Sequence, residues 1–308
     1  MTKQIYNIQN CPEPMRLDRY LRLQNSNFTQ GFLEKASRKG DLKLNGKKTK
    51  ASNRVENGDT IALYIPADLP KSEEEKLPHP GAEKLAYKLL NEYLIFQNEY
   101  FLVIDKPSGL ASQGGSNVTI SIDDALYYLN NKLFDDKVDK GFRLVHRLDR
   151  ETSGVFLIAK DRSSATKLGN GFEQKQITKT YLAIVHGRPK EPSGVVANYL
   201  TKDVKNQIQK ISSCGSYAET GYNTLFFNNK YSLMEFEPKT GRMHQIRVHA
   251  RYLGCPIVGD EKYAYEHQKT TNLMLHAWKL SVPEEIFGQD FNFESQMPKE
   301  FKNFKLDI

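Results

Sequence analysis

Nine residues dense in ionisable side chains, His146 to Gly154 (HRLDRETSG), stand directly before the apolar run 155–159 (VFLIA). The apolar run has the length and composition of a buried β-strand. Burying ionised groups costs on the order of several kcal/mol unless they are paired. The fold must therefore hold this charged segment at the end of a buried strand and supply partners for its charges. That requirement indicates a functional site rather than an ordinary loop.

The composition of the 308 residues is that of a soluble globular protein, with 39% hydrophobic and 26% charged residues. No apolar run approaches the ~20 residues of a membrane span, and none follows the first four residues, so we expect neither a membrane helix nor a secretory signal. Three widely spaced cysteines, Cys11, Cys214 and Cys255, indicate a reducing compartment without a disulfide framework or a zinc site. The expected location is the cytoplasm.

The net charge of +7 is concentrated at the beginning of the chain. Residues 1–65 hold 12 Lys and Arg against six Asp and Glu. A small folded segment with this bias is typical of modules that bind polyanions such as nucleic acids. A solvated basic surface without a partner is the alternative.

The same segment contains four predicted elements. Leucine spacing predicts a short helix over 17–24 with an apolar stripe and a basic back. A second helix is expected over 29–37, with its first residue as the N-cap and Gly40 beyond its end. Asn45-Gly46 is the strongest short-range signal of a β-hairpin, and 60–65 (TIALYI) predicts a further strand.

Two basic helices against a small sheet resemble the S4-type RNA-binding domain. The motifs that carry the resemblance are RLDRYL at 16–21 and LKLNGK at 42–47. The resemblance implies an S4-like domain over residues 1–65 that holds RNA through its phosphates. The residues expected to contact RNA there are Arg16, Arg19, Arg38, Lys39 and Lys47.

Residues 66–92 are predicted to be a linker. Four prolines and the charged run 71–76 (KSEEEK) interrupt any apolar period until about Leu85. The second domain is therefore expected to span residues 93–308.

This second domain is predicted to be α+β, built on a mixed, mostly antiparallel sheet. The expected elements are a hairpin over 93–104, a strand at 155–159, a helix from Asp161 to about Gln174, a strand at 180–185 and a hairpin over 222–236. The segment 105–116 is expected to form a tight turn and a loop. It is not a nucleotide-binding P-loop, because no Gly-Lys-Ser/Thr follows it.

A basic helix is predicted from about Met243, after the sequence TGR at 240–242, and Gly254 follows its end. Arg242 and Arg247 would then lie near its first turns, where the positive end of the helix attracts anions. His244 and His249 are five residues apart, which is the wrong spacing for two metal ligands on one helical face, so we reject a zinc site.

The chemistry of the charged segment centres on Asp149. Its neighbours Arg147 and Arg150 favour the ionised carboxylate. An ionised, positioned carboxylate is a nucleophile or a base rather than a proton donor. Two alternatives stay open on these residues: an ion pair that only fixes the loop, and a glycoside or nucleoside hydrolase with Glu151 as the second acid. Glu151 fits better as a partner of one of the arginines.

The whole chain resembles the RluA-type pseudouridine synthases. Three motifs carry the likeness in the family's order: the S4-like start, HRLDRETSG at 146–154, and TGRMHQIRVH at 240–249. Within the family the chain is most similar to the S4-bearing enzymes that modify large-subunit ribosomal RNA. The sequence departs from the family pattern at Met243, at Asp105, and in the loop around Gln113, which lacks the usual His.

The resemblance implies a role for each matching residue. Asp149 matches the catalytic aspartate, and Arg247 the basic residue that pairs with it. Tyr181 matches the tyrosine that stacks on the base and can remove the C5 proton, and Arg147 the arginine that takes part in extruding the uridine. His146 and Arg242 are further candidate RNA contacts.

The implied reaction is the isomerisation of uridine in RNA to pseudouridine. The C1′–N1 bond is cut, the uracil turns in the pocket, and C1′ is rejoined to C5. Nothing is oxidised and no group leaves, so no cofactor and no metal are expected. The predicted partner is RNA, a 23S-type ribosomal RNA or a large-subunit precursor, and the predicted assembly is a monomer. The alternative from another class is a non-catalytic RNA-binding or ribosome-assembly factor.

Overall fold

The computed structural model describes residues 2–9, 11, 13–25, 27–66, 78–115, 118–134, 139–203, 208–264 and 272–304. The chain divides into two compact units, Met1–Leu77 and Pro78–Ile308, and each is described by itself. Among the described residues, no helix is long and apolar enough to cross a membrane.

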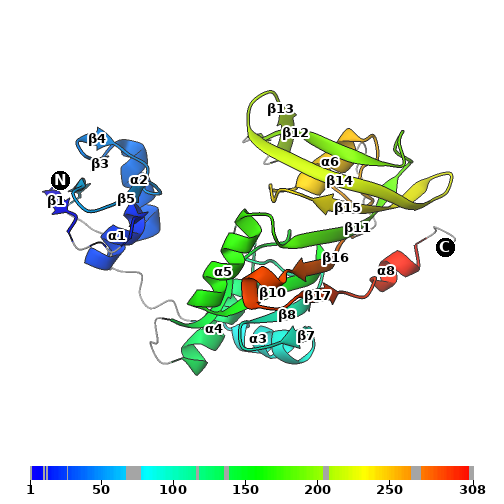
Figure 1. The fold of residues 1–308 in the computed structure, drawn as a ribbon, viewed down its shortest axis with the longest axis horizontal. Helices are drawn as coiled ribbons and strands as arrows, with labels where there is room; N and C mark the ends of the chain where they lie inside the picture. Colours follow the sequence, from blue (N-terminus) through cyan, green and yellow to red (C-terminus); the bar gives the residue numbers. More distant parts are fainter. Residues whose placement is uncertain are drawn as a thin grey trace. The chain divides into compact units, whose positions relative to one another are not determined.

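The first unit pairs two helices with a small sheet (Figure 1). The order of the four-stranded antiparallel sheet is β1-β6-β3-β4, and β2 pairs with β5. The elements of this unit are β1 (Thr2–Asn7), β2 (Met15–Arg16), α1 (Leu17–Gln24), α2 (Gln30–Lys39), β3 (Leu42–Leu44), β4 (Lys47–Lys48), β5 (Arg54–Val55) and β6 (Thr60–Ile65).

Local sequence signals account for these elements. The Thr29 hydroxyl accepts a hydrogen bond from the backbone N–H of Phe32, and Gly40 ends α2 with a φ of 89°. Asn45 and Gly46 have φ angles of 49° and 80°, as a two-residue hairpin turn requires. The predicted helices, hairpin and strand of this unit are therefore confirmed.

The second unit is built on one eleven-stranded sheet (Figure 1). Its main order is β13-β12-β14-β15-β11-β16-β10-β8-β7, with β17 on β16 and β9 on β10. Among the strands of the described residues, β10 and β16 are the one parallel pair, so the predicted mixed, mostly antiparallel α+β domain is confirmed. The elements are α3 (Ala82–Asn91), β7 (Leu94–Gln97), β8 (Phe101–Lys106), α4 (Ile122–Leu133), β9 (Lys140–Leu144), β10 (Ser153–Asp161), α5 (Arg162–Glu173), β11 (Thr178–His186), β12 (Ser193–Asp203), β13 (Ile208–Ser212), β14 (Ser216–Phe227), β15 (Tyr231–Pro238), α6 (Gln245–Tyr252), β16 (Leu275–Val282), α7 (Glu284–Phe287), β17 (Phe291–Glu294) and α8 (Lys299–Lys302).

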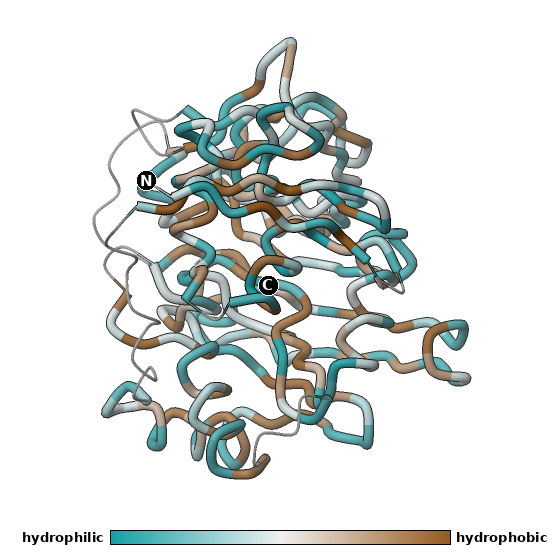
Figure 2. The backbone as a smooth tube through the Cα atoms, turned by 90° about the vertical axis from the view of Figure 1, so that its left-hand side faces the viewer, coloured by the Kyte–Doolittle hydropathy of each residue, from teal (hydrophilic) through white to brown (hydrophobic). Residues whose placement is uncertain are grey.

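Strand β10 lies inside the sheet with both of its faces covered. Phe156 and Ile158 belong to the core on one face, and Val155, Leu157 and Ala159 to the core on the other. Double burial explains why the run is continuously apolar rather than alternating. Strands β6 and β17 instead alternate, residue by residue, between buried and more exposed positions. Figure 2 shows hydrophilic and hydrophobic segments, in teal and brown, interspersed along the backbone.

The prediction of a linker over residues 66–92 needs correction. Residues 67–77 lie outside the described part of the chain, but Ala82–Asn91 form helix α3 of the second unit. Ala82, Ala86 and Leu89 are buried on one face of the helix, and Ala86 and Leu89 belong to the main core. The second unit therefore begins at Pro78 and not at residue 93, because an amphipathic helix follows directly after the last prolines.

Gly154, the second residue of β10, is under a steric constraint. Its φ is 111°, and a side-chain carbon there would lie 2.1 Å from the carbonyl oxygen of Ala277 in β16. Only glycine permits this approach of the two parallel strands.

We expect Gly154→Ala to lower the free energy of unfolding by about 3 kcal/mol, because the methyl group clashes with backbone and the φ is strained. The matched control is Gly169→Ala in α5. There the added Cβ would have no atom within 4 Å apart from its own stretch of helix, and φ is ordinary. It should raise stability by about 0.5–1 kcal/mol. Urea unfolding of both variants measures the difference, and equal stabilities would contradict the steric account.

Candidate active site

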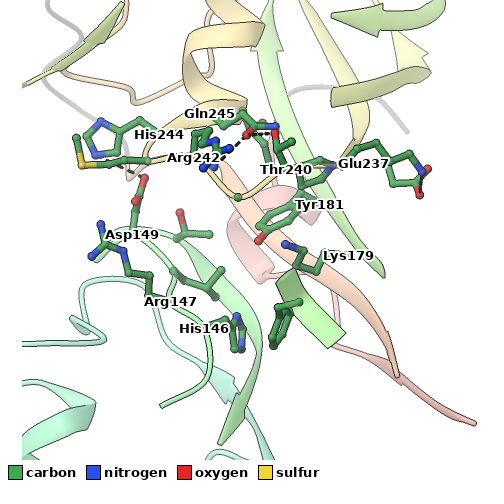
Figure 3. Close-up of a pocket in the computed structure, with 18 of the residues that line it drawn as sticks. His146, Arg147, Asp149, Lys179, Tyr181, Glu237, Thr240, Arg242, His244 and Gln245 are labelled. Atoms are coloured by element: carbon green, nitrogen blue, oxygen red, sulfur yellow. Dashed lines mark hydrogen bonds and ion pairs between the residues drawn. The ribbon is translucent and has the colours of Figure 1, made fainter. Parts of the chain in front are cut away.

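A cavity of about 710 Å³ opens in the second unit beside the charged segment. It is lined by residues of the Asp149 loop (residues 145–152), by β11 and the end of α5, and by the turn that leads into α6. Figure 3 shows Asp149, Tyr181 and Arg242 entering it from these three segments. The predicted residues of this domain, from His146 to Arg247, line one pocket.

The backbone of the Asp149 loop is held by a second segment, the support loop (residues 106–112). Lys106 is fully buried, and its ammonium donates hydrogen bonds to the carbonyl oxygens of Pro107, Leu110 and Arg150. Burial lowers the pKa of Lys106 to about 7. The Ser112 hydroxyl bonds the backbone N–H and carbonyl of Leu148. The segment predicted as a tight turn and a loop thus fixes the backbone on both sides of Asp149.

The Asp149 carboxylate is paired with Arg247. The Oδ2 oxygen of Asp149 lies 3.2 Å from Nη1 of Arg247, and the Asp149 side chain remains 28% exposed. Arg247 donates two further bonds to Asp260, from Nε at 2.8 Å and from Nη2 at 2.7 Å. Burial alone would lower the pKa of Arg247, but Asp260 and then Asp149 raise it above its usual value. The guanidinium is a permanent cation against Asp149.

Arg147 and Arg150, the sequence neighbours expected to favour an ionised Asp149, form no ion pair with it among the described residues, whereas Arg247 pairs with it as the family resemblance implied. Arg150 pairs with Glu151 at 2.6 Å, as expected for Glu151, and Arg147 is exposed without an ion pair to any described residue. The cation against Asp149 is Arg247, which lies 98 positions further along the chain.

Tyr181 projects from β11 into the same cavity (Figure 3). The ring is 9% exposed. Burial, and then the charge of Asp149, raise the pKa of Tyr181, so its phenol stays protonated at neutral pH. A flat, neutral ring beside an ionised carboxylate is suited to stacking on a planar base.

Comparisons with known proteins identify the family. Residues 100–252 match the family described as RNA pseudouridylate synthase. The ribosomal large subunit pseudouridine synthase C of Rickettsia felis is 43% identical over 297 residues, which cover 94% of this chain and 95% of that protein. The chain belongs to the RNA pseudouridylate synthase family. The enzyme of the same name from Vibrio vulnificus is 32% identical over 306 residues, covering 97% of this chain and 94% of that protein.

Solved structures agree with this assignment. Human RNA pseudouridylate synthase domain containing 4 is 29% identical and superposes with a TM-score of 0.60, covering 72% of this chain and 94% of that chain. The resemblance predicted from the sequence motifs is confirmed, and the protein is an RNA pseudouridine synthase, an isomerase.

His146 occupies a different setting from the exposed RNA contact that was expected. Its Nε2 accepts a hydrogen bond of 2.8 Å from the backbone N–H of Leu157, and its ring stacks between Phe156 and Phe172. Burial, and then the charge of Lys179, lower the pKa of His146 to about 3. The imidazole is neutral at physiological pH, so it ties the synthase's Asp149 loop to β10 and offers RNA no positive charge.

The other predicted RNA contacts are exposed. Arg242 lines the cavity, and its Nε donates to the carbonyl oxygen of Tyr217 at 2.9 Å. The first unit of the synthase carries the remaining ones, Arg16, Arg19, Arg38, Lys39 and Lys47, all with exposed side chains. Arg16 is partly neutralised by an ion pair with Asp18.

Several residues of the site were not predicted. Asp260 is almost fully buried and anchors Arg247. His244 lies 3.8 Å from the Asp149 oxygen that Arg247 contacts, and Tyr263 is within hydrogen-bond reach of His244. A buried arginine needs an acidic partner, and this requirement was the one signal that could have pointed to Asp260. The sequence did not indicate that Arg247 is buried. Among the described residues, no group of His, Cys, Asp and Glu side chains is arranged to hold a metal ion.

Proposed function

We propose that this synthase converts uridines of large-subunit ribosomal RNA to pseudouridine and that Asp149 carries the chemistry. The substrate class rests on the relatives named for the ribosomal large subunit, which match nearly the full length of the chain. The role of Asp149 rests on one observation: a carboxylate at the cavity wall is held against a buried, permanently charged arginine.

An ionised carboxylate can act on the uridine in two ways. It can bond to C1′ as N1 leaves, or it can accept the C2′ proton to give a glycal. In both, C1′ is then rejoined to C5, N1 gains a proton and C5 loses one, so the overall change is an isomerisation. Arg247 serves either course because its positive charge and its hydrogen bond hold the Asp149 carboxylate in place.

The uridine must leave its stack to reach Asp149, which costs a few kcal/mol. Arg147 lies beside Asp149 with an exposed side chain and no described ion-pair partner, and we assign it to the gap that the base vacates. Tyr181 stacks on the flipped base, which offsets about 1–3 kcal/mol of the cost. Its raised pKa favours stacking over proton removal, because a protonated phenol is a poor base.

The first unit holds the RNA in this proposal. Its helices and sheet carry the exposed cations Arg19, Arg38, Lys39 and Lys47, and its motifs resemble the S4 type. Phosphate contacts of this kind position an RNA without reading its sequence. We further propose that the synthase works as a monomer in the cytoplasm, where ribosomal RNA is available.

We expect Asp149→Asn to abolish tritium release from RNA labelled with 5-tritiated uridine while leaving RNA affinity nearly unchanged. The amide keeps the shape of the side chain but cannot act as a nucleophile or base. Glu151→Gln is the control, because it removes a nearby charge whose ion pair among the described residues is with Arg150, and it should retain activity. Turnover by Asp149→Asn would sink the proposal, and free uracil among the wild-type products would indicate a hydrolase instead.

Replacing Arg19, Arg38, Lys39 and Lys47 together by Gln should weaken RNA binding and flatten its salt dependence. Each lost phosphate contact lowers the slope of log K against log salt by roughly 0.7–0.9. A matched variant loses four exposed lysines of the second unit, Lys84, Lys140, Lys190 and Lys230. Binding titrations from low to moderate salt measure both slopes. Equal slopes in the two variants would show that the basic surface of the first unit has no specific role.

A further inference from the structure

A chain of hydrogen bonds fixes the orientation of His244 beside Asp149. The backbone N–H of Gln209 donates to the Tyr263 hydroxyl at 2.8 Å, and that hydroxyl lies 2.8 Å from Nδ1 of His244. Within the described residues, His244 Nδ1 is the one acceptor in hydrogen-bond reach of the Tyr263 proton. Nδ1 therefore accepts, and in a neutral imidazole the ring proton must be on Nε2.

The protonated Nε2 faces the reacting carboxylate. It lies 3.8 Å from Oδ2 of Asp149, and the His244 side chain is only 11% exposed. Figure 3 shows the Asp149 carboxylate directed toward His244. The distance is too long for a hydrogen bond in the free enzyme. Contacts of this kind commonly shorten when substrate closes an active site.

His244 is neutral in this setting. The charged and titratable groups that face it are Asp149, Arg247, Asp260, Lys262 and Tyr263. Burial is the largest influence and lowers the pKa of His244 to about 4, despite the nearby carboxylates. A neutral imidazole donates a hydrogen bond without surrendering its proton, so it can orient Asp149 and leave the carboxylate ionised.

The backbone conformation at His244 is a further sign that the residue is held in place. Its φ of 53° lies in the left-handed region, which is costly for a residue other than glycine, and it stands at the start of α6. Gln245 braces the adjoining turn: its side chain accepts from the Thr240 hydroxyl and from the N–H of Arg242, as Figure 3 shows. The turn thus holds a strained residue with its ring against Asp149.

We propose that His244 is a positioning residue that donates its Nε2–H to the Asp149 carboxylate in the substrate complex, with Tyr263 setting the tautomer. Arg247 contacts the same Oδ2 oxygen of Asp149, so the two side chains would together fix the position of that oxygen. The inference rests on the proposed function of Asp149.

Two substitutions separate this role from simple packing. In His244→Gln the amide nitrogen replaces Nε2 and keeps the donor toward Asp149. In His244→Asn the amide replaces Nδ1, so it keeps the contact with Tyr263 and loses the donor. Asn tolerates the left-handed backbone better than Gln. Backbone strain alone therefore favours His244→Asn, the opposite of what the proposal expects.

We expect His244→Asn to lower kcat for tritium release roughly ten- to a hundredfold with little change in KM, and His244→Gln to retain most of the wild-type kcat. Equal rates, or a faster His244→Asn variant, would overturn the proposal. An independent readout is the ¹⁵N spectrum of the histidine ring. Wild type should show neutral Nε2–H at His244 from pH 5 to 8, and Tyr263→Phe should show a mixture of tautomers. An Nδ1–H tautomer in wild type would also overturn it.

Failure of this inference is distinguishable from failure of the proposed function. A wild-type enzyme that releases no tritium from ribosomal RNA contradicts the proposed function, whatever the His244 variants do. A wild-type enzyme that is active, with His244→Asn equally active, contradicts the role of His244 alone.

Discussion

The active site depends on one buried guanidinium that two carboxylates share. Arg247 is anchored by two hydrogen bonds to the almost fully buried Asp260, and its remaining terminal nitrogen contacts Asp149 at the cavity. Removing one partner of a buried ion pair costs roughly 3–5 kcal/mol, because the other charge is left without compensation. Asp260 therefore determines the position of Arg247, and Arg247 in turn holds the Asp149 carboxylate at the cavity.

The rest of the second unit supplies the two sides of this contact. On one side, the support loop binds the backbone of the Asp149 loop through Lys106 and Ser112. Gly154 then lets the loop pass into β10 at close approach to β16. On the other side, α6 carries Arg247 and packs on the strands β13, β14 and β15. The loop backbone thus positions Asp149, and a charged side chain from a helix distant in sequence forms an ion pair with it.

The sequence predicted what local interactions determine. The N-cap at Thr29, the turn at Asn45-Gly46 and the doubly buried β10 each follow from a few adjacent residues. Strand β12 was missed because only two of its residues, Val196 and Leu200, are buried, which leaves no alternating pattern. Helix α3 was absorbed into the linker by the prolines and charges before it.

The candidate site was predicted in its residues and, through the family resemblance, in the pairing of Arg247 with Asp149, but not in the anchoring of Arg247 by Asp260. Motif resemblance selected Asp149, Tyr181 and Arg247, and the structure places all three at one cavity. The positive charge beside Asp149 was also expected from its sequence neighbours, and that part was wrong. In the loop, Arg150 pairs with Glu151, and the cation that contacts Asp149 comes from helix α6. Asp260, which no local pattern marked, is known only from the folded chain.

The most direct test of this account is the single-turnover rate of pseudouridine formation by Asp260→Asn. The amide preserves the volume of the buried side chain and removes the charge that anchors Arg247. We expect a rate lower by roughly one to two orders of magnitude, with the fold and RNA affinity retained. A wild-type rate would show that Arg247 holds Asp149 without its anchor, and that the active site does not depend on the shared guanidinium.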